Sequence, residues 1–85
     1  MARVKVFSTA HCPFCVKAKQ LLTKWKIPFD EAMIDSDMSA RREFTIATNG
    51  ARTVPQIIID GVCIGGFTEL TELHMDDKLD HLVEE

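Results

Sequence analysis

The spacing of hydrophobic and polar residues predicts alternating strands and helices in the first half of the chain. Polar and apolar residues alternate over 3–7, as in a half-buried strand, and apolar residues recur at helical spacing over 12–25. A short apolar segment, 29–34, is expected to be a second strand, and a helix is expected over 39–49 with Asn49-Gly50 at its end. Because a helix joins the two strands, they should lie parallel with a right-handed crossover.

The first predicted helix is amphipathic. Its apolar face is expected to carry Val16, Ala18, Leu21, Leu22 and Trp25, and its solvent face Lys17, Lys19 and Lys24. This pattern predicts a helix that packs on a sheet through one side.

The second half is predicted to contain a hairpin followed by two short helices. The expected elements are strands at 56–59 and 62–64 joined by the turn Asp60-Gly61, a helix over 69–75 capped by Thr68, and a last helix that starts at Asp76-Asp77 and turns Leu79, Leu82 and Val83 inward. The whole order is β-α-β-α-β-β-α(-α). It indicates an α/β fold with a four-stranded mixed sheet flanked by helices.

Length and composition indicate one small globular domain spanning residues 1–85, with 46% hydrophobic and 27% charged residues. The net charge of -3 is uneven: residues 1–59 carry nine Lys and Arg against five Asp and Glu, whereas 60–85 carry one against eight. An acidic chain without an aromatic and basic stripe is a poor nucleic-acid binder, so nucleic acid is not an expected partner.

Cysteine usage and hydropathy indicate a reducing compartment. Three cysteines are too few to staple a small secreted fold, and the first residues lack the apolar stretch of a signal peptide. No apolar run approaches the ~20 residues of a membrane span. We therefore expect a cytoplasmic protein that makes no membrane contact.

The motif Cys12-Pro13-Phe14-Cys15 falls where the first strand gives way to the first helix. The unpaired N–H groups and the positive end of the dipole at a helix N-terminus stabilise a thiolate, which would make Cys12 a nucleophile. Cys15 lies one turn further along, within reach of a disulfide with Cys12, and could resolve a mixed disulfide formed there. Pro13 suits the first helical turn, which needs no N–H.

Two other interpretations of this motif are a metal site and a pair of unreactive buried thiols. A structural zinc site needs four ligands, and the remaining candidates are His11, His74, His81 and Cys63. Without a second C-x-x-C, the sequence favours a redox pair and predicts no metal ligands. An iron–sulfur cluster shared between two chains stays open as an alternative.

Two further features are ambiguous when each is taken alone. In Thr53-Val54-Pro55, a proline opens the third predicted strand, where it can simply be a turn residue. Gly65-Gly66 followed by Thr68-Glu69 can form a nest of N–H groups that holds a carboxylate, or merely a turn.

Together these three motifs resemble the glutaredoxin family, specifically its short bacterial dithiol members, over essentially the whole chain. The resemblance implies a thioredoxin-like fold, a cis peptide bond before Pro55, and catalysis by Cys12 and Cys15. It also implies glutathione as the reducing co-substrate with no bound cofactor. The substrates would be protein disulfides and glutathionylated proteins, and the protein would be a monomer. The residues it assigns to glutathione binding are Phe14, Thr53, Val54, Pro55, Gly66, Thr68 and Glu69.

The chain departs from the common family pattern at two places. Relatives often carry a lysine shortly before the first cysteine, where this chain has Ser8-Thr9-Ala10-His11, and an aspartate where Thr68 stands. Weaker glutathione binding is the expected consequence. Arg52, Arg41 or Arg42 could supply charge for the glycyl carboxylate, or could be ordinary solvated arginines.

The remaining candidates have simple structural interpretations. Cys63 is expected to be an inert hydrophobic residue on its strand, and Trp25 and Phe44 to be core or partly buried core residues. His11 could tune Cys12 or be incidental.

The predicted function is therefore that of a glutathione-dependent thiol–disulfide oxidoreductase. The alternatives are the same chemistry coupled to a thioredoxin reductase, and a non-enzymatic iron–sulfur or metal carrier.

Overall fold

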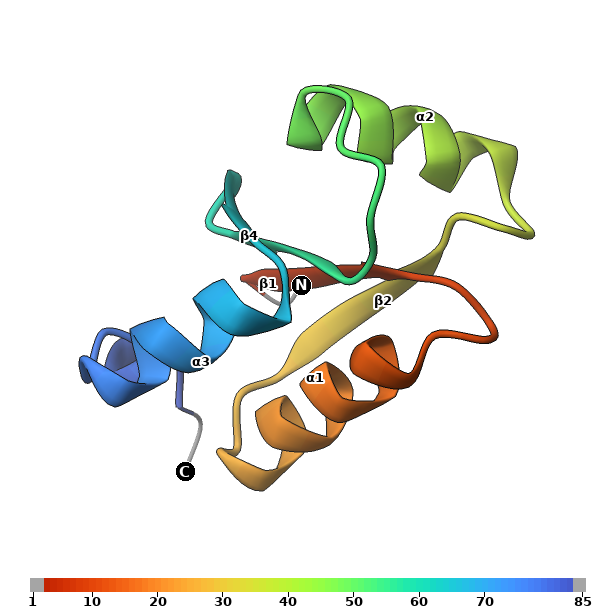
Figure 1. Cartoon of the computed structure of the whole chain (residues 1–85). Helices are drawn as coiled ribbons and strands as arrows, with labels where there is room; N and C mark the ends of the chain where they lie inside the picture. The colour runs from red at the N-terminus through yellow and green to blue at the C-terminus, as the bar shows by residue number, and fades with distance from the viewer. Residues whose placement is uncertain (1–2, 84–85) are drawn as a thin grey trace.

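The computed structural model describes residues 3–83 and arranges them as a four-stranded sheet with helices on both sides (Figure 1). The elements in chain order are β1 (Val4–Ser8), α1 (Pro13–Lys24), β2 (Phe29–Met33), α2 (Met38–Thr48), β3 (Gln56–Ile59), β4 (Val62–Gly65), α3 (Phe67–Met75) and the 3-10 turn η1 (Asp80–Leu82). The predicted order of strands and helices is confirmed as far as α3, and so is the thioredoxin-like fold class.

The sheet is mixed, with strand order β2-β1-β3-β4. β1 and β2 are parallel, as their helical connection predicts, and β3 pairs antiparallel with both β1 and β4. The hairpin between β3 and β4 turns through Asp60 at φ 50° and Gly61 at φ 83°. Positive φ at both turn residues matches the right-handed twist of the strands, which confirms the predicted Asp-Gly hairpin.

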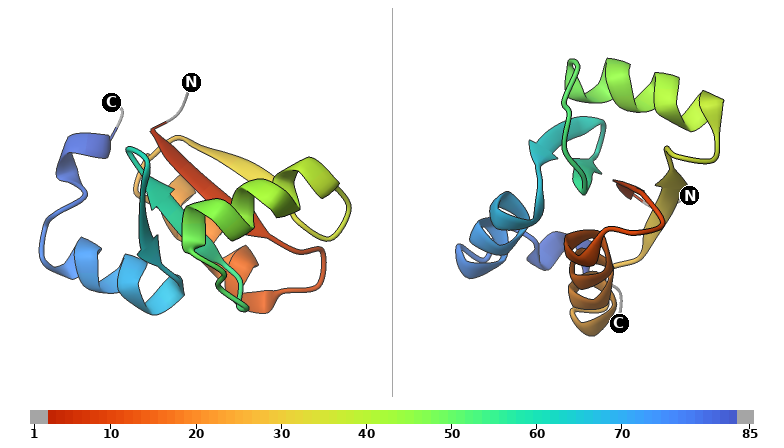
Figure 2. Two further views of the ribbon diagram at one scale, coloured as in Figure 1. Left: turned by 90° about the horizontal axis from the view of Figure 1, so that it is seen from above. Right: turned by 45° about the vertical axis from the view of Figure 1, so that its right-hand side comes forward.

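Each face of the sheet covers its own hydrophobic cluster. α1 and α3 lie on one side of the sheet and α2 on the other (Figures 1 and 2). The buried residues of the first cluster are Val4, Val6, Ala18, Leu22, Ile27, Ile57, Leu70, Leu79 and Leu82, and those of the second are Phe7, Ile34, Ala40, Phe44 and Ile58. Phe44 is a core residue and Trp25 packs against the first cluster as a partly buried residue, so the predicted core or partly buried core positions of both are confirmed.

The start of α3 differs from the prediction. Gly66 is the N-cap, the helix begins at Phe67, and Oε1 of Glu69 accepts the Gly66 N–H at 2.7 Å. Thr68 is therefore inside the first turn, and its prediction as the cap is wrong. The long Glu69 side chain reaches back to the cap residue, a bond that a threonine hydroxyl cannot replace from that position.

The acidic pair after α3 ends that helix and does not start another. Asp76 is its C-cap, Asp77 is left-handed at φ 57°, and the N–H of Lys78 donates to the carbonyl of Leu73 at 3.0 Å. This bond satisfies a carbonyl that the helix end leaves free. The predicted last helix is reduced to η1, which buries Leu82 but leaves Val83 exposed.

Two side chains of α1 differ in their exposure from the prediction. Val16 is 45% exposed, although it was expected to be inward. Lys19 was expected in solvent, yet its side chain is only 27% exposed because it pairs with Glu31 of β2. Within residues 3–83, no helix is both long and apolar enough to cross a lipid bilayer.

Candidate active site

Cys12 caps the N-terminus of α1. Its backbone is extended, at φ -115° and ψ 106°, and its Sγ accepts the N–H of Cys15 at 3.2 Å. Pro13 occupies the first helical position, where a missing N–H costs nothing. The half-buried Cys12 sulfur therefore faces helix N–H donors, the environment that stabilises a thiolate.

Cys15 lies three residues along α1 and is fully buried. Burial, followed by the hydrogen bond to Cys12, raises the pKa of the Cys15 thiol to about 12. Both thiols are free in this structure. The two sulfurs are thus neighbours in unlike surroundings.

The segment before β3 brings a backbone edge to Cys12. The Val54-Pro55 peptide bond is cis, as the resemblance implies, and Cys12 Sγ donates to the carbonyl oxygen of Val54 at 3.5 Å. The ladder between β1 and β3 begins at Gln56. The backbone of Val54 therefore lies beyond the paired part of the sheet.

A shallow pocket of about 210 Å³ opens beside this edge. It is lined by Phe14, Thr53, Val54, Pro55, Gly66, Phe67, Thr68 and Glu69. The set includes all seven residues that the resemblance assigns to glutathione binding. Segments from α1, the loop before β3 and the start of α3 meet here.

Aromatic rings and the α3 cap shape the pocket. The rings of Phe14 and Phe67 lie 5.6 Å apart between centroids, and Nζ of Lys17 lies 5.2 Å from the centroid of Phe14. At Gly65, φ is 109°, and a Cβ there would come within 2.6 Å of Oε1 of Glu69. Only glycine allows the backbone to pass this close to the capping carboxylate.

The glutaredoxin family model matches residues 4–64. Glutaredoxin 3 of Escherichia coli K12 is 41% identical over 83 residues, covering 98% of this chain and 99% of that protein. This chain belongs to the glutaredoxin family. It is a thiol–disulfide oxidoreductase.

Solved glutaredoxins share the fold of this family member. A buckwheat glutaredoxin–glutathione complex superimposes with a TM-score of 0.82 at 28% identity, covering 96% of this chain and 76% of that one. Glutaredoxin 1 from Francisella tularensis, complexed with cacodylate, gives 0.73 at 39% identity, covering 94% and 99%.

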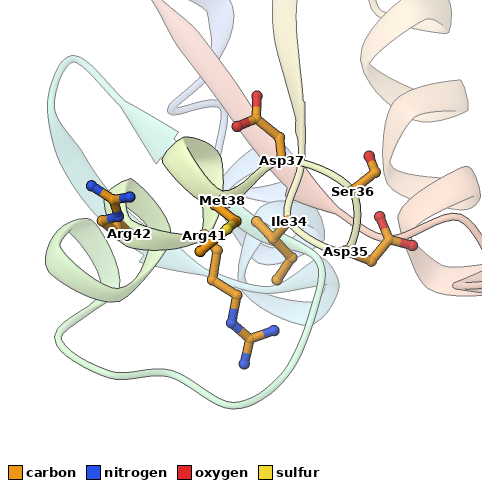
Figure 3. A pocket seen from close by; sticks show the side chains of 7 residues that line it. All are labelled: Ile34, Asp35, Ser36, Asp37, Met38, Arg41 and Arg42. Carbon is orange, nitrogen blue, oxygen red and sulfur yellow. The ribbon is translucent and has the colours of Figure 1, made fainter.

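The arginines considered from the sequence do not join the pocket of this glutaredoxin. Arg52 is exposed and is not among its lining residues. Arg41 and Arg42 line a different cavity of about 630 Å³, and the Arg41 side chain points into the space below α2 (Figure 3). Asp35 in that cavity accepts the N–H of Ala10 at 2.9 Å, which ties it to the loop before Cys12. A role for these arginines in binding the glycyl carboxylate remains a prediction.

The other cysteine and histidine candidates lie apart from the pocket. Cys63 is half-buried against the second cluster, and its Sγ lies 3.6 Å from Oε1 of Gln56. His11 is exposed. Across residues 3–83, no three His, Cys, Asp or Glu side chains gather as candidate metal ligands.

Sequence reasoning missed two parts of this site. Phe67 lines the pocket, and its only sequence signal is its place directly after the glycine pair. The second part is Lys19, which lies one turn beyond Cys15 and pairs with Glu31. Its spacing of four residues from Cys15 was the available signal.

Proposed function

We propose that this glutaredoxin reduces glutathionylated proteins and protein disulfides with glutathione, using Cys12 as nucleophile and Cys15 as resolving thiol. The observation that carries the proposal is the position of Cys12. Its sulfur contacts the carbonyl of Val54 at the edge of a pocket that contains every residue expected to bind glutathione. Monomeric state and cytoplasmic location are part of the proposal.

The nucleophile is supported by its hydrogen bonding. The sulfur of Cys12 accepts an N–H at the start of α1, and the same N–H stabilises negative charge when the proton leaves. A thiolate attacks a disulfide sulfur directly, and a well-stabilised thiolate is also a good leaving group. Cys12 suits both halves of an exchange reaction.

Backbone groups at the pocket support glutathione as the proposed reductant. The backbone of Val54 lies outside the ladder of β3, free to pair strand-like with the cysteine residue of glutathione. The first N–H groups of α3, those of Phe67 and Thr68, have no partner within the helix and suit the carboxylate of the γ-glutamyl end. A glutathione complex of the buckwheat glutaredoxin adds support from a relative.

The proposed reaction balances as two exchanges. The Cys12 thiolate attacks the glutathione sulfur of a glutathionylated protein. The disulfide bond breaks, the protein leaves as a thiol, and glutathione remains bonded to Cys12. A second glutathione then attacks that sulfur, which releases oxidised glutathione and restores Cys12. With a protein disulfide, the Cys12 thiolate bonds to one protein sulfur and the other leaves as a thiol. Cys15 then attacks the Cys12 sulfur, which releases the reduced protein and forms an internal disulfide, and two glutathione molecules reduce that disulfide and leave as oxidised glutathione.

A coupled assay tests the reductant. The protein is given a glutathione mixed disulfide as substrate, and NADPH consumption is followed with glutathione plus glutathione reductase, or with thioredoxin reductase alone. We expect turnover only in the first mixture. Turnover that needs thioredoxin reductase and ignores glutathione would overturn the proposal. Visible absorbance of freshly purified protein would instead indicate an iron–sulfur carrier.

A further inference from the structure

A small charged network begins one helical turn beyond Cys15 on α1. Nζ of Lys19 pairs with Oε2 of Glu31, and the two side chains are 27% and 31% exposed. The same Oε2 accepts the hydroxyl of Ser8 at 2.8 Å, and Ser8 is fully buried at the end of β1. The ammonium is thus held by a carboxylate that is itself fixed by the sheet. A surface pair whose side chains sway in solvent would not be held this way.

The network is placed where it can act on Cys15. Lys19 follows Cys15 by four residues on α1, and residues at this spacing lie on one helix face with Cβ atoms about 5–6 Å apart. Burial and the hydrogen bond to Cys12 raise the pKa of Cys15, whereas a backbone hydrogen bond from Thr9 and the charge of Lys19 lower it. Within residues 3–83, the charged or titratable groups acting on Cys15 are Cys12 and Lys19.

The resolving step needs a charge that the burial of Cys15 opposes. Cys15 must lose its proton to solvent before its sulfur can attack, and a fully buried thiolate has no water around it to stabilise the charge. The ammonium of Lys19, although paired with Glu31, lowers the pKa of Cys15 and so offsets part of that cost.

We propose that Lys19, held in place by Glu31 and Ser8, is the positioning residue that makes Cys15 available as the resolving thiolate. This inference rests on the proposed roles of Cys12 and Cys15. In the step concerned, the Cys15 thiolate bonds to the Cys12 sulfur of a mixed disulfide and is oxidised. The bond between Cys12 and glutathione breaks, and glutathione leaves reduced and takes up a proton.

Oxidation by excess oxidised glutathione separates the two steps. All variants carry Cys63→Ser, so that two thiols remain. Samples taken over time are acid-quenched and alkylated, and mass spectrometry counts the reduced, mixed-disulfide and internally disulfide-bonded forms. Lys19→Gln should form the mixed disulfide at the wild-type rate and convert it to the internal disulfide about tenfold more slowly. The mixed disulfide should therefore accumulate.

Matched variants separate charge from structure. Lys19→Arg keeps the charge and should restore the conversion rate. Lys24→Gln removes an exposed lysine from the last turn of the same helix and should convert like wild type. With pH, the conversion rates of Lys19→Gln and wild type should rise in parallel and stay offset, because both remain below the pKa of Cys15.

The conversion rates of these variants test the role of Lys19. Conversion by Lys19→Gln at the wild-type rate would overturn it, as would equal slowing in Lys24→Gln. If Lys19→Gln fails to fold, the neutral pair Lys19→Gln with Glu31→Gln replaces it. The slowing must then appear in that pair, and its absence refutes the role of Lys19. If the wild-type protein forms no mixed disulfide at all, the proposed function itself has failed.

Discussion

The surroundings of Cys12 and Cys15 differ more than their separation of one helical turn suggests. Cys12 is half-buried at the end of α1, beside the backbone of Val54 and an open pocket. Cys15 is fully buried, and the charge that acts on it is that of Lys19, which pairs with Glu31. Substrate can reach the first sulfur, and only an intramolecular partner can reach the second. The contrast shows that one helix start can place two thiols in unlike surroundings, because a single turn separates the surface from the core, and this difference is what the proposed attacking and resolving roles require.

The largest effect is expected from Cys12→Ser, which removes the accessible sulfur. Turnover of both a glutathione mixed disulfide and a protein disulfide should fall to background, since Cys15 is buried and Cys63 lies against the second cluster. The glutathione reductase couple measures both. Cys63→Ser is the matched control and should retain activity. Substantial activity in Cys12→Ser would end the contrast between the two sulfurs.

Alkylation should distinguish the thiols almost as sharply. At near-neutral pH, a sub-stoichiometric dose of iodoacetamide should label Cys12 at least about a hundredfold faster than Cys15, because only the thiolate reacts. The pKa of Cys15, raised to about 12, keeps that thiol protonated until the solution is strongly alkaline. Peptide mapping locates the label. Initial labelling of Cys15 or Cys63 would contradict the assignment of the nucleophile.

Cys15→Ser should lower the reduction of protein disulfides but not deglutathionylation. Reduction of a protein disulfide should fall by about tenfold or more, because no internal thiol resolves the mixed disulfide, whereas deglutathionylation needs only Cys12 and a second glutathione. The measurement compares both substrates in the same couple. Loss of both activities in a folded variant would mean that Cys15 activates Cys12 as well as resolving it.

Gly65→Ala tests the part of the pocket formed by the α3 cap. The new Cβ would come within 2.6 Å of the Glu69 carboxylate and displace the cap of α3, so the KM for glutathione should rise by about tenfold. Gly61→Ala is a fair control. Gly61 also has a positive φ, at 83°, but has open space around its Cβ position. An equal rise in KM for both variants would show that backbone strain is responsible.

The smallest effect is expected on the stability of the fold when the Lys19–Glu31 pair is broken. Pairing with Lys19 lowers the pKa of Glu31 below its ordinary value of 4.5, and the bond from Ser8 adds to this. The ionised carboxylate therefore stabilises the fold above that ordinary value, and the benefit is lost as pH falls through the lowered pKa. Because the pair is partly exposed, Glu31→Gln should cost about 0.5 kcal/mol at neutral pH and less in acid. Urea unfolding measures the difference, with the exposed Glu72→Gln as control.

Much of the fold could be predicted because local chemistry and the tertiary structure agree. The Asp60-Gly61 turn needs positive φ at two residues, and the sequence provides two that adopt it readily. A helix between β1 and β2 favours a parallel arrangement of those strands. The order of strands and helices follows from such local rules, without knowledge of distant contacts.

The errors arise where a side chain binds a partner that the spacing of apolar residues does not reveal, either on another element or within a helix cap. Lys19 looks like a solvent residue until the sheet places Glu31 beside it, and no pattern within α1 reveals that partner. The cap of α3 depends on Glu69 reaching back to Gly66, which excludes Thr68 from the capping position. Residues of three separate motifs line the pocket, and these motifs meet only after folding. The resemblance therefore predicted which residues gather there, whereas their geometry required the structure.

The stacking of Trp25 on His74 has a spectroscopic consequence. The two rings lie 3.8 Å apart between centroids and are tilted by 9°, at the end of α1 opposite to Cys12. Because α1 has 12 residues and is about 18 Å long, Trp25 lies far from Cys12. Trp25 is also the single tryptophan of the chain. Intrinsic fluorescence therefore reports the contact between α1 and α3. A redox titration followed by tryptophan emission will be silent unless oxidation of the cysteines moves the whole helix.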